Sequence, residues 1–132
     1  MIVASSALVA IALRQPGFEA LLTAVAEAPR VAIGAPTLVE TTIVLSARLG
    51  IDARGITSRL LIEGDFSIVP FTDAHYGTAT DAWLRYGRGR HPAALNFGDC
   101  LTYATARLAN EPLLCTGEDF ARTDLEIVRQ TS

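Results

Sequence analysis

The chain has 132 residues, half of them hydrophobic and 19% charged. This length suits a single domain spanning 1–132 that buries a core without disulfides or a structural metal, and the composition excludes a disordered protein. Fourteen acidic residues outnumber eleven basic residues, which are all arginine. Without lysine, a lysine nucleophile, a Schiff base and a P-loop are excluded. The net charge of −3 argues against a protein that coats nucleic acid.

The two cysteines, Cys100 and Cys115, lie in apolar sequence without a CxxC motif or a histidine pair at zinc spacing. We therefore expect two buried thiols in a reducing cytoplasm. The apolar N-terminus has no positively charged segment, is interrupted by two serines and ends at Arg14. We expect neither a signal peptide nor a membrane-spanning helix, and hence a cytoplasmic protein.

Short apolar runs and helical stripes alternate along the chain, and proline or glycine separates many of them. The apolar runs predict strands at 1–3, 31–33, 66–69 and 112–115, with a candidate fifth at 125–128. Apolar spacing and breakers predict helices at 7–13, 18–28, 36–49, 53–62, 73–86 and 99–109. The expected N-caps are Ser5 or Ser6, Asp52, Thr72 or Asp73, and Asp99.

Strands that alternate with one or two helices predict a three-layer α/β/α fold. Its central sheet is expected to be mostly parallel, with four to five strands, helices on both faces and the first strand in the middle. In such sheets, functional residues gather at the carboxyl ends of the strands. The residues that follow each strand are therefore the candidates for a site.

Carboxylates follow the strands at that edge. Glu40 lies in the second turn of the helix after strand 31–33, Asp99 begins a later helix, and Asp119 follows strand 112–115. Each alone is explained as a helix cap or a solvated acid, but grouped like charges repel each other unless a cation is present. Hard oxygen ligands favour Mg²⁺ or Mn²⁺. The residue at the end of the first strand is Ala4, where an acid would complete the pattern.

Four segments carry a specific pattern: MIVASSALVA at the start, PTLVET around Glu40, GRGRHPAALNFGDC at 87–100 and PLLCTGEDFARTD at 112–124. In this order and spacing, they resemble PIN-domain ribonucleases, and in particular the VapC toxins of bacterial VapBC toxin–antitoxin pairs. The resemblance covers essentially the whole chain. It implies a PIN fold and an endoribonuclease that cleaves RNA with water activated by Mg²⁺ or Mn²⁺.

The resemblance also implies a metal site of four acids. Its positions fall, in chain order, on Ala4, Glu40, Asp99 and Asp119. Three of the four match, and the first is alanine. Supporting polar or acidic groups fall on Ser6, Glu118 and Asp124.

Alanine at position 4 has two explanations. One is an engineered Asp→Ala change that silences a toxin, and the other is a natural loss that leaves a non-catalytic PIN-fold protein acting through antitoxin or RNA binding. The other acids remain, which favours the first explanation. Under either explanation, we expect this chain to bind metal poorly and to cleave RNA slowly or not at all.

The loop before Asp99 contains Arg88, Arg90 and His91, a local positive patch in an acidic protein. It is a candidate for steering the RNA backbone towards the site. The alternative is a solvated loop, or an arginine paired with a nearby acid. His75 is expected on the surface or facing a partner, and the stripe of Tyr76, Trp83 and Tyr86 is expected in the core.

The resemblance implies two protein partners: a VapB antitoxin, whose C-terminal segment covers the apolar helices near 7–25 and 43–62, and a second copy of the chain in a homodimer. The RNA target is expected to be a transfer or ribosomal RNA. A nucleotide-binding flavodoxin-like domain fits poorly, because no strand is followed by a glycine loop that would hold a phosphate. Ser6 lacks the neighbouring base that a covalent nucleophile needs.

Overall fold

The computed structural model describes residues 1–130 of the chain. Four strands and six α-helices alternate along it, followed by a short 3₁₀-helix. The strands are β1 (Ile2–Val3), β2 (Val31–Gly34), β3 (Phe66–Val69) and β4 (Leu113–Leu114). The helices are α1 (Ser5–Ala12), α2 (Phe18–Glu27), α3 (Ala35–Leu49), α4 (Arg54–Glu63), α5 (Asp73–Tyr86), α6 (Phe97–Ala109) and the 3₁₀-helix η1 (Phe120–Arg122).

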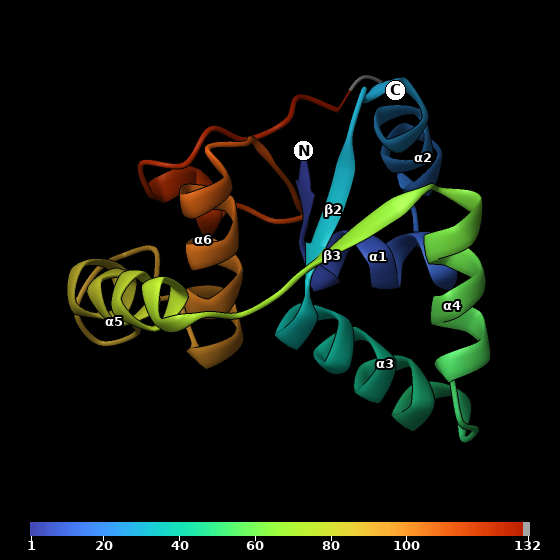
Figure 1. Ribbon diagram of the computed structural model, residues 1–132, viewed down its shortest axis with the longest axis horizontal. Coiled ribbons are helices and arrows are strands. Elements are labelled where there is room, and N and C mark those ends of the chain that lie inside the picture. The colour runs from blue at the N-terminus through green and yellow to red at the C-terminus, as the bar shows by residue number, and fades with distance from the viewer. Residues whose placement is uncertain (131–132) are drawn as a thin grey trace.

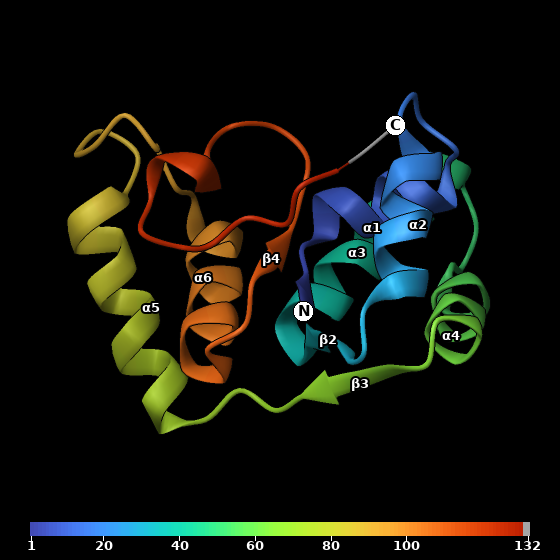
Figure 2. The ribbon, with the colours of Figure 1, turned by 90° about the horizontal axis from the view of Figure 1, so that it is seen from above.

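The strands form one parallel sheet in the order β3-β2-β1-β4, so β1 is a central strand as predicted. The candidate fifth strand is only an isolated bridge, in which Ile127 pairs with Leu113. Figures 1 and 2 show α5 and α6 on one side of the sheet and α1, α2 and α4 on the other. The predicted three-layer α/β/α architecture is confirmed.

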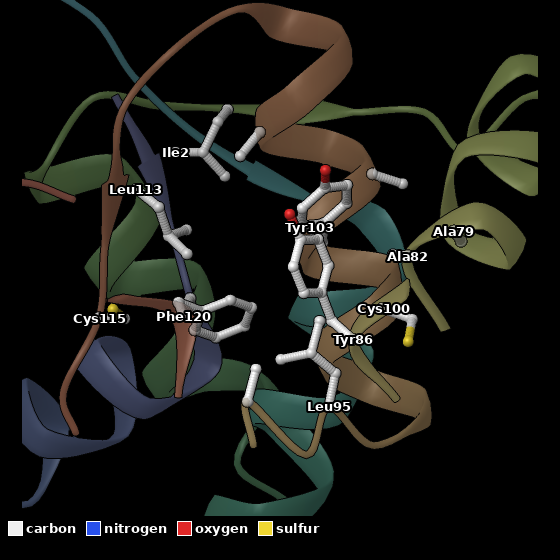
Figure 3. Packing of buried hydrophobic residues seen from close by; sticks show 14 residues of the cluster. Ile2, Ala79, Ala82, Tyr86, Leu95, Cys100, Tyr103, Leu113, Cys115 and Phe120 are labelled. Atoms are coloured by element: carbon white, nitrogen blue, oxygen red, sulfur yellow. The ribbon is translucent and has the colours of Figure 1, made fainter. Parts of the chain in front are cut away.

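Successive strand residues supply two separate cores, because neighbouring side chains of a strand point to opposite faces. Ile2 and Leu113 pack with α5 and α6, whereas Val3 and Leu114 pack with α1 and α2. Figure 3 shows the first of these clusters, in which Tyr86 and Tyr103 lie near Leu95. Because β1, β2 and β4 are buried on both faces, they read as continuous apolar runs in the sequence, whereas β3 at the edge of the sheet is partly exposed.

Helix α3 lies across the carboxyl end of the sheet. It follows β2 directly, contacts α1 and α6, and ends at Gly50 (Figure 1). Gly50 adopts a left-handed conformation with φ of 66°, and its N–H donates a 2.9 Å hydrogen bond to the Ser46 carbonyl. Glycine takes this conformation without the steric cost of a side chain, so it ends the helix where the sequence predicted.

Three of the predicted N-caps are wrong by one to three residues. Helix α1 is capped by Ala4 rather than by a serine, and α4 by Ala53 rather than by Asp52. Helix α6 is capped by Asn96, which leaves Asp99 as its third residue. Thr72 caps α5 as predicted.

Helix α5 places its aromatic residues differently from the prediction. His75 is buried, because its ring nitrogen pairs with Thr72 in the cap of α5, so the expectation of a surface histidine is wrong. Tyr86 is in the core, but Tyr76 is exposed and Trp83 is 44% exposed. Within residues 1–130, no helix is both long enough and apolar enough to span a bilayer.

Candidate metal and RNA site

Three of the four expected site positions lie at the carboxyl edge of the sheet because they follow parallel strands. Ala4 comes directly after β1, Glu40 lies in α3 after β2, and Asp119 precedes η1 after β4. The fourth position, Asp99, is brought to the same place by the N-terminal end of α6, which packs against α3. Residues from four separate segments therefore meet at one edge.

Asp99 is held in place by a reciprocal cap. Its N–H donates a 2.9 Å hydrogen bond to the Asn96 side-chain oxygen, and the Asn96 N–H donates a 3.1 Å hydrogen bond to Asp99 Oδ2. This capping box satisfies two backbone donors that a helix start leaves free and fixes the direction of the carboxylate. The pattern Asn-x-x-Asp was readable in the sequence, and sequence reasoning missed it.

The electrostatic environment of Asp99 includes the other two candidate acids. Burial raises the pKa of Asp99 above its usual value, and the negative charges of Asp119 and Glu40 raise it further. The hydrogen bond from the Asn96 N–H and the positive charge of Arg88 oppose this rise in the pKa. The charges of Glu40 and Asp119 thus disfavour the charged form of Asp99, an effect that a bound cation would reverse.

Glu40 reaches this place by lying against the backbone of Gly98. A Cβ atom built on Gly98 would be only 2.6 Å from Glu40 Oε2 and 3.0 Å from Oε1. The carboxylate therefore occupies the space that a side chain at position 98 would take, beside Asp99. Sequence reasoning missed Gly98, because a glycine next to an acid has no distinctive local pattern.

Ala4, the residue that follows β1, has a methyl group as its only side chain. It is 2% exposed, and its N–H donates a 2.9 Å hydrogen bond to the Leu114 carbonyl. Two residues later, Ser6 Oγ accepts a 3.1 Å hydrogen bond from the Thr116 N–H. Ser6 thus ties the start of α1 to the segment after β4 that leads to Asp119.

The side chains at the expected metal-site positions have the oxygen ligands that suit a hard cation, but one of the four positions has none. Glu40, Asp99 and Asp119 offer carboxylate oxygens, the ligands that Mg²⁺ and Mn²⁺ prefer. Position 4 offers no side-chain oxygen. Within residues 1–130, no three histidine, cysteine, aspartate or glutamate side chains are close enough to enclose a metal ion.

The two remaining acids lie in different places. Glu118 is exposed and close to Cys115, where burial, assisted by the charges of Glu118, Asp99 and Asp119, raises the pKa of the thiol to about 11. Asp124 instead accepts a 2.6 Å hydrogen bond from the Tyr103 hydroxyl and lies 3.7 Å from Arg85. The structure does not bring Asp124 into the group around Asp99.

In the positive loop before Asp99, the side chains of two residues make hydrogen bonds within residues 1–130 and the side chain of the third makes none. The guanidinium carbon of Arg90 lies 4.9 Å from the centre of the Trp83 ring, and its Nε donates a 3.0 Å hydrogen bond to the Leu84 carbonyl. His91 Nδ1 accepts a 3.0 Å hydrogen bond from the Ala93 N–H. Arg88 is exposed, acts on Asp99 by its charge, and makes no side-chain hydrogen bond or ion pair within residues 1–130.

Both cysteines are free and buried, as expected. In Figure 3 they lie on opposite sides of the core cluster, Cys115 near Phe120 and Cys100 beyond Tyr86. They therefore act as small core residues that flank the acidic edge.

Comparisons with known proteins agree with the fold. The PIN domain family model matches residues 1–126. Ribonuclease VapC36 of Mycobacterium tuberculosis is 50% identical over 127 residues, covering 96% of this chain and 91% of that protein. Ribonuclease VapC of Mycolicibacterium smegmatis is 38% identical, covering 97% and 99% of the two chains.

Solved structures share the fold at lower identity. VapC20 of Mycobacterium tuberculosis, described as a toxin that cleaves the sarcin–ricin loop, superposes with a TM-score of 0.78 at 20% identity, covering 97% of this chain and 98% of its own. VapBC2 of Rickettsia felis, bound to a DNA fragment from its promoter, superposes with a TM-score of 0.73 at 16% identity, covering 99% and 98%. From the matched family model and the 50% identical relative, the chain belongs to the PIN-domain family and, within it, to the VapC ribonucleases.

Proposed function

We propose that this chain is a VapC toxin endoribonuclease scaffold whose cleavage step is disabled by alanine at position 4. The observation that carries the proposal is that the charges of Glu40 and Asp119 raise the pKa of Asp99, while the residue that follows β1 is a buried alanine. An RNA-cleaving PIN site needs these carboxylates, although that of Asp99 also caps α6.

The local structure around Ala4 supports an acid at this position. Ala4 is the N-cap of α1 and makes no side-chain cap hydrogen bond. Alanine is among the poor N-cap residues, whereas aspartate is among the best. An aspartate at position 4 would therefore suit the start of α1 as well as a metal site.

Each remaining acid has a proposed role in that site. Asp99 and Asp119 would hold Mg²⁺ or Mn²⁺ together with the residue at position 4, and Glu40 would bind the ion directly or orient a water molecule. Such an ion, when bound, neutralises the scissile phosphate and makes water a better nucleophile. Ser6 and Glu118 support the edge, Ser6 through its bond to the Thr116 N–H.

The RNA backbone is proposed to meet Arg88 first. Arg88 is exposed beside Asp99, whereas the side chains of Arg90 and His91 are already engaged within their own loop. A guanidinium suits phosphate because its planar N–H groups donate two parallel hydrogen bonds. Of the three candidates, Arg88 is therefore the one positioned for the substrate, which we propose to be a ribosomal or transfer RNA.

The alternative is a natural non-catalytic member of the family that acts by binding an antitoxin or RNA. The buried methyl of Ala4 favours it, and the three retained acids favour the disabled enzyme. We therefore place the enzyme first.

A VapB antitoxin in the cytoplasm is the proposed partner, together with a second copy of the chain. An open cavity of about 760 Å³ supports an apolar partner segment, since Leu8 and Ile11 of α1, Val25 of α2 and Leu60 of α4 line it. This cavity includes parts of both helical regions that the sequence assigned to the antitoxin. Light scattering of the chain alone and mixed with its antitoxin tests both assemblies.

Ala4→Asp tests the function. We expect the variant to cleave RNA in Mg²⁺ and to arrest growth when expressed, whereas the unchanged chain and the Ala4→Asp/Asp99→Asn double variant do neither. Strong Mg²⁺-dependent cleavage by the unchanged chain would contradict the proposal. A folded Ala4→Asp variant that neither binds metal nor cleaves RNA would favour the non-catalytic alternative.

A further inference from the structure

Gly98 is the second residue of α6 and lies directly beside Asp99. A Cβ atom at this position would be 2.6 Å from Glu40 Oε2, 3.0 Å from Oε1 and 3.1 Å from Cδ. All three distances are shorter than an ordinary van der Waals contact. The whole Glu40 carboxylate therefore rests against the bare backbone of Gly98.

The backbone gives no reason for a glycine here. Gly98 is not among the residues with positive φ, which are the positions where glycine is conformationally favoured. Glycine is also a poor helix former, so an alanine would suit the first turn of α6 better. The benefit of Gly98 must therefore come from the space that it leaves.

Gly55 provides a direct comparison within the same chain. It is the second residue of α4, as Gly98 is the second residue of α6, and it also has no positive φ. A Cβ atom at Gly55 would meet nothing within 4 Å. The two glycines occupy the same helical position and differ in what surrounds them.

We infer that Gly98 is a positioning residue for Glu40: its missing side chain lets the Glu40 carboxylate lie next to Asp99. This inference rests on the proposed metal site and assigns a further residue to it. An alanine at position 98 would turn the end of Glu40 away from the site. Because that end is flexible, the fold would remain intact while the donor set is disturbed.

A purely structural role predicts the opposite pattern of effects. If Glu40 merely fills a gap beside α6, then Gly98→Ala alters stability and leaves metal binding unchanged. If Gly98 positions Glu40, then Gly98→Ala weakens metal binding. The melting temperature of the Gly98→Ala variant then stays at or above that of the Gly55→Ala variant. Metal affinity and melting temperature together therefore separate the two roles.

The test compares Gly98→Ala with Gly55→Ala, each in the Ala4→Asp background, by Mn²⁺ binding and thermal melting. We expect Gly98→Ala to weaken Mn²⁺ binding by about 10- to 100-fold, the range typical of groups that orient metal ligands. Gly55→Ala should leave Mn²⁺ affinity unchanged. Equal Mn²⁺ affinity in the two variants, or a Gly98→Ala chain that fails to fold, would overturn the inference.

A crystal structure of the chain with Gly98→Ala alone separates this inference from the proposed function. It should show the Glu40 carboxylate displaced from the first turn of α6. A Glu40 carboxylate that stays in place overturns the inference even if the metal site is real. Failure of the Ala4→Asp variant to bind Mn²⁺ overturns the proposed function. Even then, the position of the Glu40 carboxylate in the crystal structure of the Gly98→Ala variant decides the role of Gly98.

Discussion

The guanidinium of Arg90 is stacked on the ring of Trp83, with 4.9 Å between the guanidinium carbon and the ring centre. A second contact, from Arg90 Nε to the Leu84 carbonyl, fixes the same side chain to the end of α5. Two residues earlier, Arg88 is exposed and close enough to Asp99 to lower its pKa. Two arginines in one loop thus have different tasks, the first facing the acidic edge and the second holding the loop.

Arg88→Ala should weaken RNA binding without destabilising the fold. Measured with a labelled single-stranded RNA, the slope of log affinity against log salt should decrease in magnitude by about 0.7, the value for one phosphate contact. The chain with Ala4 suits this measurement because cleavage is expected to be slow or absent.

Arg90→Ala is the matched control for that experiment. It should cost about 1 kcal/mol of unfolding free energy, because it removes one cation–π contact and one hydrogen bond, and it should leave the salt slope unchanged. Identical salt slopes for Arg88→Ala and the unchanged chain would count against a phosphate contact at Arg88.

The sequence predicted the layers, the central position of β1 and most element boundaries, because these depend on local signals. The apolar run at 1–3 and the break at Gly50 are examples. It also predicted that Glu40, Asp99 and Asp119 would meet, since parallel strands end at one edge. Glu40 and Asp119 contribute to the raised pKa of Asp99. No three such side chains within residues 1–130 are close enough to enclose a metal ion, so the metal site stays a prediction.

The features that escaped prediction depend on contacts between residues far apart in the chain. Ser6 was a candidate supporting group, but its partner Thr116 is 110 residues away in the chain and no local pattern indicates it. Asp124 looked like a supporting acid, whereas its hydrogen-bond partner is Tyr103 on α6. No local pattern specifies which of two plausible partners a side chain will meet after folding.

Asp99→Asn should stabilise the metal-free chain at neutral pH. The pKa of Asp99 is raised above its ordinary value of 3.8, so the folded state holds its proton to a higher pH than the unfolded state does. Stability therefore decreases as the pH rises from 3.8 through the folded-state pKa, and it stays lower above that pH. Asparagine avoids this loss and still accepts the hydrogen bond from Asn96.

Chemical denaturation at pH 7 and below pH 3.8 measures the effect of Asp99→Asn. The gain in stability should be present at pH 7 and disappear at the lower pH. Asp52→Asn is the control with the opposite sign, because its neighbour Arg54 lowers the pKa of Asp52 to about 2. A loss of stability from Asp99→Asn at pH 7 would refute the view that burial and the neighbouring acids disfavour the charged form of Asp99.

Tyr103→Phe should destabilise the fold without affecting the metal site. The Tyr103 hydroxyl donates a 2.6 Å hydrogen bond to Asp124, and burial with this bond raises the pKa of Tyr103 to about 12. A hydrogen bond to a charged group contributes about 1.5–3 kcal/mol, which is the expected loss in unfolding free energy.

Asp124→Asn tests the other partner of the Tyr103–Asp124 hydrogen bond. In the Ala4→Asp background, it should lower the melting temperature and leave Mn²⁺ affinity unchanged, because Asp124 pairs with Tyr103 and Arg107 rather than with Asp99. A marked decrease in Mn²⁺ affinity would instead show that Asp124 belongs to the metal site.

Mn²⁺ binding by the unchanged chain, Ala4→Asp and Ala4→Asn tests most directly whether position 4 is the missing ligand. The account predicts weak binding by the unchanged chain and at least about tenfold tighter binding by Ala4→Asp, a difference of about 1.4 kcal/mol. Ala4→Asn, similar in shape but uncharged, should fall well short of that gain. Mn²⁺ affinity that is equal in the unchanged chain and in Ala4→Asp would contradict the account.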